Sequence, residues 1–343
     1  MNEEEVSLGT GKGPVGPTES FLPSQSEEVG SSLLQDVLAA GASDADILDA
    51  LLKASADQLM PWQNCDLPSR GLYYGWTSGT IEVRPWGVNV DKILATPRLA
   101  QTGQSIDYML KHCCRFPEGF DTQDLLVGDQ VFLLYYLRGI THGNNYEFAV
   151  HCANQSCQAM STHSVDLNEL ASTIVWADEA LGPEPFRIDL PYLSRRLGKT
   201  FWVGIRFLRV RDMQSIARSQ KATNRLTKGS RARLKKRGPP AQTQHSEGEE
   251  IPIDESLTQN LERVIVSVMG VTDRFKINAL LASNKLHSSD LATIREWLAD
   301  HSPAIQTQVD LTCPECQSEF PVMLPITETF FRPQEPRGVR EGV

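Results

Sequence analysis

The sequence contains no apolar run long enough to cross a membrane. Its longest such run, Val131 to Leu137, is far shorter than the roughly 20 residues that a membrane-spanning helix requires. The first residues, MNEEEVSLGTGKGPVGP, also lack the basic start and the apolar stretch of a secretory signal. We therefore expect a protein without a transmembrane segment that is first present in the cytosol.

Familiar catalytic motifs are absent as well. The sequence has no glycine-rich phosphate-binding loop, no HExxH motif and no GxSxG motif. Its seven histidines, at positions 112, 142, 151, 163, 245, 287 and 301, do not pair with carboxylates at a recognisable spacing. We therefore expect no enzymatic activity, and a catalytic triad assembled from distant residues is the alternative.

Cysteine is scarce, with seven in 343 residues. That number is too small for a disulfide framework in a chain of this length, and thiols stay reduced in the cytosol. Metal ligation and plain burial are the two interpretations that remain. Cys113 and Cys114 end the helical apolar stripe of SIDYMLKHCC, so we expect these two to be small core residues.

Positive charge is in deficit, because 33 Lys and Arg stand against 43 Asp and Glu, a net charge of −10. This balance argues against a general nucleic-acid binder, whose affinity depends on neutralising phosphates. Residues 218–237 are the exception, with nine Lys or Arg and no acid. They contain no aromatic residue for base stacking. We therefore favour a flexible loop here, with a nucleic-acid contact as the alternative.

What is present divides the chain into five segments. Residues 1–60 are predicted to be a disordered tail with short amphipathic helices around 33–38 and 47–52, which pack either on the body or in a partner's groove. The other segments are an α+β body with the first cysteine hairpin at 61–217, a basic and polar flexible linker at 218–254, a helical segment with the second cysteine hairpin at 255–331, and a flexible tail at 332–343.

Hydrophobic periodicity predicts the elements within these segments. Alternation predicts strands in TIEVRPWGV, in NNYEFAVHC, on both sides of CPEC, and in FRIDLPYL and KTFWVGIRFLRV, the last two as a hairpin. DTQDLLVGDQVFLLYYLRGI is predicted to be a buried helix, and Asp212 is a candidate cap for the helix that follows it. Three more helices are predicted from Glu255 onward: the first runs to Met269, and the last is capped by Ser288 or Ser289.

Two cysteine pairs give the clearest chemical signal. Cys152 and Cys157 lie in HCANQSC, Cys313 and Cys316 lie in CPEC, and strand-like segments flank both. A tight loop between two strands points two thiolates at one position, and two such hairpins complete the tetrahedral four-cysteine site of structural zinc. Because 155 residues lie between the pairs, such a metal joins the two ends of the segment between them.

Two other interpretations apply to these residues. In the first, the four cysteines are unrelated buried thiols. In the second, His151 or His163, which lie close to the first pair in the sequence, replaces one thiolate. A redox role for CPEC requires the pair at a helix N-terminus. The strand-like flanks of CPEC argue against that role.

Several segments, taken in order, resemble one protein family. LPSRGLYY followed by IEVRPW, then DLLVGDQVFLLYYLRGITHGNNYEFAVHC, FWVGIRFLRVRD and DLTCPECQSEFPVMLP look like the T4-type baseplate hub assembly proteins of contractile-tailed bacteriophages, over roughly residues 65–330. The resemblance implies a structural role in building the baseplate, and it matches the four cysteines to the family's paired-cysteine hairpins. The first pair departs from the family in its C-x4-C spacing, where C-x2-C is more usual.

The sequence thus predicts an α+β fold in which short β-hairpins and helices surround a zinc-ribbon-like site of four cysteines, with an inserted helical segment and disordered arms. With the resemblance, it predicts a non-catalytic baseplate component or assembly factor that is stabilised by zinc. Its expected partners are other baseplate and tail-hub proteins, in multiple copies and without nucleic acid or membrane. Its expected place is the tail baseplate of a virion assembled in the bacterial cytoplasm. The alternative is a zinc-ribbon nucleic-acid-binding protein.

Overall fold

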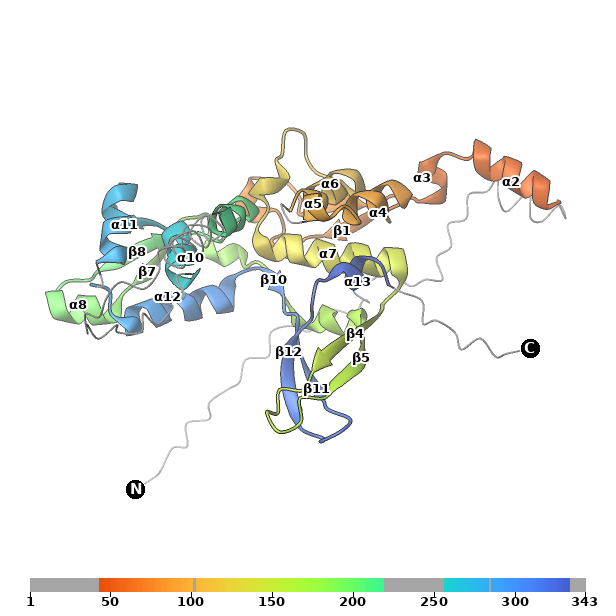
Figure 1. Ribbon diagram of the computed structural model, residues 1–343. Helices are drawn as coiled ribbons and strands as arrows, with labels where there is room; N and C mark the ends of the chain where they lie inside the picture. Colours follow the sequence, from red (N-terminus) through yellow and green to blue (C-terminus); the bar gives the residue numbers. More distant parts are fainter. Residues whose placement is uncertain (1–42, 101–102, 219–255, 284, 334–343) are drawn as a thin grey trace, which may run out of the picture.

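The computed structural model describes residues 43–100, 103–218, 256–283 and 285–333 (Figure 1). Within them, helices alternate with small antiparallel sheets, and the buried apolar side chains form two clusters. The predicted α+β class, with hairpins around a four-cysteine cluster, is confirmed. None of the helices in these ranges is both long enough and apolar enough to cross a membrane.

The second of the predicted N-terminal helices is present as α2 (Asp44–Lys53), which begins at a capping box formed by Ser43 and Asp46. The short helix α3 (Ala56–Leu59) follows it. The first predicted helix, the basic segment from 219 onward and the end of the chain after 333 lie outside the described residues. The division into five segments stays a prediction.

A three-stranded antiparallel sheet forms one side of the larger cluster. Its strands, in spatial order, are β1 (Gln63–Asp66), β2 (Thr80–Val83) and β3 (Cys114–Arg115). Between β2 and β3 the chain forms α4 (Val88–Leu94), α5 (Pro97–Ala100) and α6 (Gln104–Cys113). Cys113 and Cys114 are both buried, which confirms them as core residues, although Cys114 belongs to a strand and not to the helix.

Helix α7 (Val127–His142) is the central element of the larger cluster. Residues 132–139 are all buried, which confirms the predicted buried helix. Arg138 is accommodated inside the core because its guanidinium donates to the carbonyl oxygens of Gly143 and Asn145. Near the start of α7, Gly128 lies against β10 (Ala304–Ile305), which pairs with β6 (Ile174–Val175).

Two β-hairpins extend from the α7 region. β4 (Asn145–His151) pairs with β5 (Met160–Asp166), and β11 (Gln308–Thr312) pairs with β12 (Glu319–Met323), both antiparallel. Figure 1 shows the two hairpins side by side below α7. The strands predicted on both sides of each cysteine pair are therefore confirmed.

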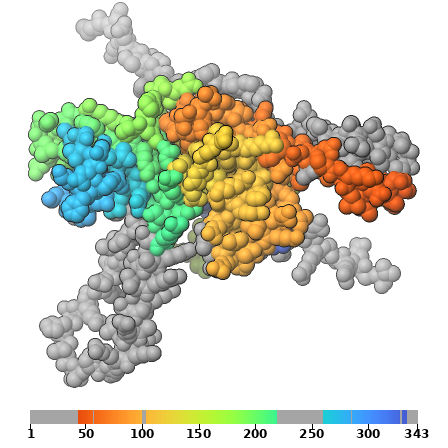
Figure 2. Space-filling view, turned by 90° about the horizontal axis from the view of Figure 1, so that it is seen from above, coloured from red at the N-terminus to blue at the C-terminus, as the bar shows by residue number. Residues whose placement is uncertain are grey.

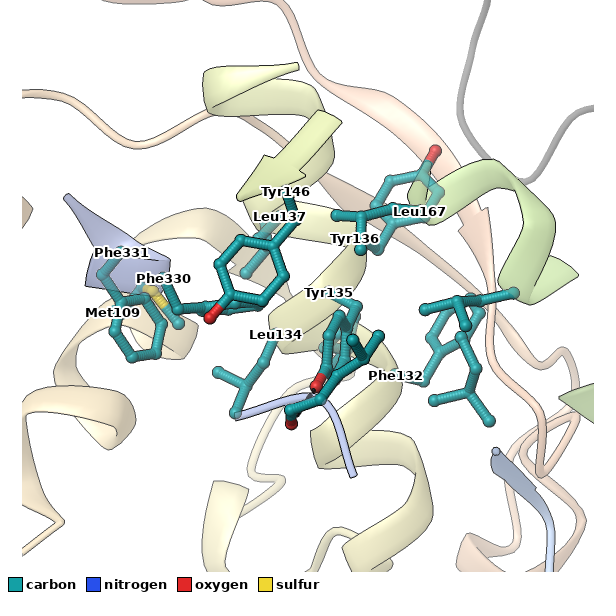
Figure 3. Packing of buried hydrophobic residues seen from close by; sticks show 14 of the residues in the cluster. Met109, Phe132, Leu134, Tyr135, Tyr136, Leu137, Tyr146, Leu167, Phe330 and Phe331 are labelled. Carbon is teal, nitrogen blue, oxygen red and sulfur yellow. Dashed lines mark hydrogen bonds between the residues drawn. The ribbon is translucent and has the colours of Figure 1, made fainter. Parts of the chain in front are cut away.

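Aromatic side chains from distant segments pack on α7 (Figure 3). Tyr135 of α7, Tyr146 of β4 and Phe330 of α13 (Glu328–Phe331) meet edge to face, with ring centroids 4.9 and 5.1 Å from that of Phe330. The hydroxyls of Tyr135 and Tyr146 donate to the carbonyl oxygens of Leu324 and Pro325, at 2.9 and 2.6 Å. These contacts hold the segment after β12 against α7 and so position the second hairpin.

The smaller cluster is built on a second antiparallel sheet. Its strands, in spatial order, are β7 (Phe186–Asp189), β8 (Trp202–Ile205) and β9 (Ile265–Val268). Its helices are α8 (Pro191–Leu197), α10 (Ser256–Val264), α11 (Arg274–Ala282) and α12 (Ser288–His301). In Figures 1 and 2 this unit lies at the end of the molecule opposite α2.

The sequence-based prediction of a helix up to Met269 is wrong. The helix ends at Val264, and the β-branched residues that follow it form β9, because they pair with the free edge of β8. The hairpin of β7 and β8 is confirmed by their antiparallel pairing. However, α8 lies between the two strands, and β8 ends at Ile205 and not at Phe207.

Two predicted helix caps are also wrong. Asp212 lies inside the first turn of the helix over 210–218, where its carboxylate accepts from the N–H of Arg209 at 3.0 Å and binds Arg206 through two oxygens. The N-cap of α12 is His287, whose Nδ1 accepts from the N–H of Ser289 at 3.2 Å. Asp212 thus accepts a free N–H at the start of its helix from a position inside the first turn, whereas His287, which precedes both serines, caps α12.

Candidate metal centre

The first cysteine loop closes the β4–β5 hairpin. Cys152 follows β4, and its N–H donates to the carbonyl oxygen of Ala159 at 2.9 Å. The N–H groups of Cys157 and Gln158 both donate to the carbonyl oxygen of Asn154, at 3.0 Å. Gln158 has a φ of 48°, in the left-handed region that allows the chain to reverse.

The second cysteine loop closes the β11–β12 hairpin in the same way. The N–H of Cys313 donates to the carbonyl oxygen of Ser318 at 3.0 Å, and the N–H of Gln317 donates back to Cys313 at 2.9 Å. Gln317, directly after Cys316, has a φ of 57°. Both loops therefore place a left-handed glutamine after their second cysteine.

The two loops differ in length only in the residues that precede their final helical turn. In the C-x2-C loop, the N–H of Gln317 donates to the carbonyl oxygen of Cys313 and closes one helical turn. In the C-x4-C loop, the N–H of Gln158 closes the same turn on the carbonyl oxygen of Asn154, two residues after Cys152. The two extra residues thus precede a turn of the same form. The longer spacing of the first pair is compatible with the same arrangement of thiols.

The two loops bring all four predicted ligand sulfurs together. Cys152 Sγ lies 3.6 Å from Cys316 Sγ, Cys157 Sγ lies 3.9 Å from Cys313 Sγ, and all four lie within 4.8 Å of one another. Four sulfurs at about 2.3 Å from one tetrahedral ion are about 3.8 Å apart. The cluster therefore has the dimensions of a metal site. Across the described ranges, no second group of three or more such side chains converges.

Polar groups lie against the sulfurs. The hydroxyl of Ser318 lies 3.0 Å from Cys316 Sγ, and the N–H of Asn154 donates to Cys152 Sγ at 3.4 Å. Such donors orient metal ligands and tune their basicity. Sequence reasoning missed both residues, although each lies two positions after a cysteine of its loop.

The pKa values of the Cys316 and Cys157 thiols shift in opposite directions. Hydrogen bonds from the Ser318 hydroxyl and from its backbone N–H lower the pKa of the Cys316 thiol to about 6. The backbone N–H of Ala159 lowers the pKa of the Cys157 thiol, but burial and the neighbouring thiols of Cys316 and Cys313 outweigh it and raise this pKa to about 11.

The cluster is half inside and half outside the core. Cys152 and Cys313 are buried in the larger cluster, whereas Cys157 and Cys316 lie toward the solvent. A metal held here therefore joins the two hairpins at the edge of the core, where each contributes one inner and one outer sulfur.

Neither histidine named in the sequence analysis belongs to this group. The Nδ1 of His151 contacts the carbonyl oxygen of Gln158 at 3.4 Å, and the Nε2 of His163 contacts the hydroxyl of Ser161 at 2.8 Å. The four convergent ligand atoms are all cysteine sulfurs. The arrangement thus corresponds to a set of four thiolate ligands.

The remaining three cysteines are core residues. Cys65, Cys113 and Cys114 are buried, and burial raises the pKa of each thiol, that of Cys113 to about 12. A thiol of this kind is protonated and unreactive at neutral pH. These residues therefore contribute packing and not chemistry.

A scan of protein-family models, a search of curated proteins and a search of solved structures found no match to this chain. The resemblance to baseplate hub assembly proteins therefore stays a prediction that rests on its motifs. The chemical inference rests on the cluster itself. Four cysteine sulfurs that converge within 4.8 Å form a possible metal site, and a closed set of four protein ligands is typical of structural sites.

Proposed function

We propose that this chain is a structural or assembly protein whose two cysteine hairpins are joined by one zinc ion. The observation that carries the proposal is the convergence of Cys152, Cys157, Cys313 and Cys316 within 4.8 Å. Thiolates are soft ligands that favour zinc over calcium or magnesium, and a set of four is typical of structural sites. Such a site stabilises a fold and needs no catalytic residue beside it.

The metal would link segments that are distant in the sequence. Cys157 and Cys313 are 156 positions apart, and the whole β7–β8–β9 unit lies between them. Binding to two hairpins at once lets the free energy of metal binding stabilise the fold. A rigid body that presents several surfaces suits a component of a larger assembly.

The test of the zinc proposal combines metal content with stability. Elemental analysis of the purified chain should find one zinc per molecule. Cys313→Ser should lower both the zinc content and the melting temperature, because zinc binding in small peptides is worth about 10 to 16 kcal/mol and part of it supports folding.

Cys113→Ser is the matched control, since Cys113 is buried but does not belong to the four-cysteine cluster. A buried hydroxyl there should lower the melting temperature but leave the zinc content unchanged. Full zinc retention by Cys313→Ser would refute the four-cysteine site.

We place this protein in the baseplate of a contractile phage tail, in its hub or wedge region. Support comes from the ordered series of motifs that resembles the hub assembly family. Its partners are then other baseplate and tail-hub proteins, present with it in multiple copies and assembled in the bacterial cytoplasm. Mass spectrometry of purified tails from the phage that encodes the chain should detect the chain with a defined copy number. Its absence from intact tails would contradict a place in the finished baseplate.

A zinc-ribbon nucleic-acid-binding protein is the alternative. It is favoured by the nine basic residues of segment 218–237 and opposed by the net charge of −10. A DNA-binding assay at several salt concentrations separates the two, because binding through phosphate contacts weakens steeply with salt. A strong, salt-sensitive affinity would support the alternative over the structural role.

A further inference from the structure

Helix α2 exposes an apolar face that no described segment covers. Leu48, Leu51 and Leu52 are 57%, 39% and 75% exposed, and no residue of α2 is buried. Figure 1 shows α2 projecting from the body beyond α3. An apolar helical face of this kind is normally buried against another surface.

The leucines of α2 are accompanied by negative charge. Residues 43–59 contain four Asp and one Lys, and Asp44, Asp46 and Asp49 are exposed. The fourth, Asp57, is paired with Arg84 of the body at 2.8 Å. The surface that receives α2 should therefore combine apolar side chains with positive charge.

That combination is found at the other end of the same molecule. Around α8 and α11, residues 187–199 and 271–285 contain seven Lys or Arg and two Asp. Leu197, Val271 and Phe275 are 60%, 45% and 82% exposed there. Exposed basic neighbours include Arg195, Arg196, Lys199 and Lys276.

The two surfaces do not meet within one molecule. Figures 1 and 2 show α2 at one end of the body and the β7–β8–β9 unit with α8 and α11 at the other. The base of the α2–α3 arm is tied to the first sheet, because Arg84 binds Asp57 and also stacks, with Arg115, on the ring of Trp62. A surface complementary to α2 is therefore available on a second copy.

We propose that α2 of one copy docks on the α8–α11 end of a second copy, so that the chain associates head to tail. Helix α2, with its exposed leucines and exposed aspartates, supplies one half of the contact. The basic end around α8 and α11, with the exposed Phe275, supplies the other. A contact between two different surfaces leaves one of each free, and it builds a ring where the rotation closes. This inference does not depend on the zinc site or on membership of a baseplate, so its failure would leave both standing.

The test is sedimentation velocity of the full-length, zinc-loaded chain over a range of concentrations. The wild type should form oligomers that weaken as salt rises, since exposed charges contribute to the contact. Leu48→Gln with Leu52→Gln, and separately Phe275→Gln, should each weaken self-association at least about tenfold, because each removes apolar area from the contact. Met323→Gln is the control, since Met323 is 63% exposed on β12, a strand that Figure 1 shows below α7 and away from both α2 and the α8–α11 end.

Mixing the two defective variants gives the decisive result. The α2 variant keeps an intact basic end and the Phe275 variant keeps an intact α2, so their mixture should form a 1:1 dimer that grows no further. A wild type that stays monomeric at every concentration, a mixture that stays monomeric, or variants that associate like the wild type would each overturn the proposal. So would DNA binding without self-association that is lost in Arg195→Glu with Arg196→Glu, which would assign the basic end to nucleic acid.

Discussion

Asp129 is a buried carboxyl group in the first turn of α7. The N–H of Ser69 donates to its Oδ1 at 3.0 Å and the hydroxyl of Tyr74 donates to its Oδ2 at 2.6 Å, and neither partner is charged. Burial outweighs these hydrogen bonds and raises the pKa of Asp129 to about 6. Folding therefore favours the protonated form of this side chain.

This pKa predicts the sign of one contribution to stability. Asp129 has a pKa of about 3.9 when the chain is unfolded. Between pH 4 and 6, this carboxyl group is therefore protonated to a larger extent in the native state than in the unfolded state. The stability contributed by Asp129 should fall as pH rises through this window, by on the order of 3 kcal/mol in all.

Asp129→Asn should remove that dependence, and the free energy of unfolding of both proteins at several pH values tests it. Metal release at low pH affects both proteins, so their difference isolates the carboxyl group. Parallel stability curves for the two proteins would contradict the assignment.

At the scale of elements, Gly128 sets how closely α7 approaches β10. A Cβ at this position would lie 1.9 Å from the carbonyl oxygen of Pro303 and 2.8 Å from the Cβ of Ala304. In an exposed helix, Gly→Ala stabilises by up to about 1 kcal/mol. Here Gly128→Ala should instead destabilise the protein by about 1 to 3 kcal/mol, because backbone must move. Chemical denaturation measures the difference, and an unchanged or raised midpoint would show that the two elements separate easily.

Asp290 joins two helices of the smaller cluster. Its carboxylate is buried and accepts from the N–H groups of Tyr192 and Leu193 at 2.8 and 3.1 Å. These are free donors of the first turn of α8. Asp290→Ala should destabilise the protein by about 1 to 3 kcal/mol and speed hydrogen exchange in α8.

Asp300→Ala is the matched control for Asp290→Ala, because Asp300 lies exposed on the same helix. It should change the free energy of unfolding by no more than about 0.5 kcal/mol. Equal effects of the two substitutions would show that Asp290 does not act through α8.

These elements show which features the sequence could predict. The strands around each cysteine pair follow from local alternation, and the paired spacing is itself local, so both loops were predictable. The edge of β8 that turns Ile265–Val268 into a strand is contributed by residues about 60 positions earlier. Asp290 caps a helix that is 98 positions away. Such long-range contacts override local propensity, and no pattern within a short window reveals them.

At the scale of the whole molecule, the proposed metal and the two apolar clusters stabilise different parts of the fold. The four cysteines border the larger cluster, which also contains α7 and the C-terminal aromatic side chains. The smaller cluster is held by its own sheet and by α8, α10, α11 and α12. It contributes no ligand sulfur, so its stability should depend little on the metal.

Removal of the metal should therefore have a local effect. Hydrogen exchange measured by mass spectrometry, with and without a chelator, should show faster exchange in β4, β5, β11 and β12, because the two hairpins lose the bond that joins them. The peptides of β7, β8 and β9 should exchange as before. Cys313→Ser without a chelator should reproduce this pattern, since it removes one ligand. Faster exchange throughout the chain would mean that the metal supports both clusters together, whereas no change anywhere would mean that the four sulfurs hold no metal.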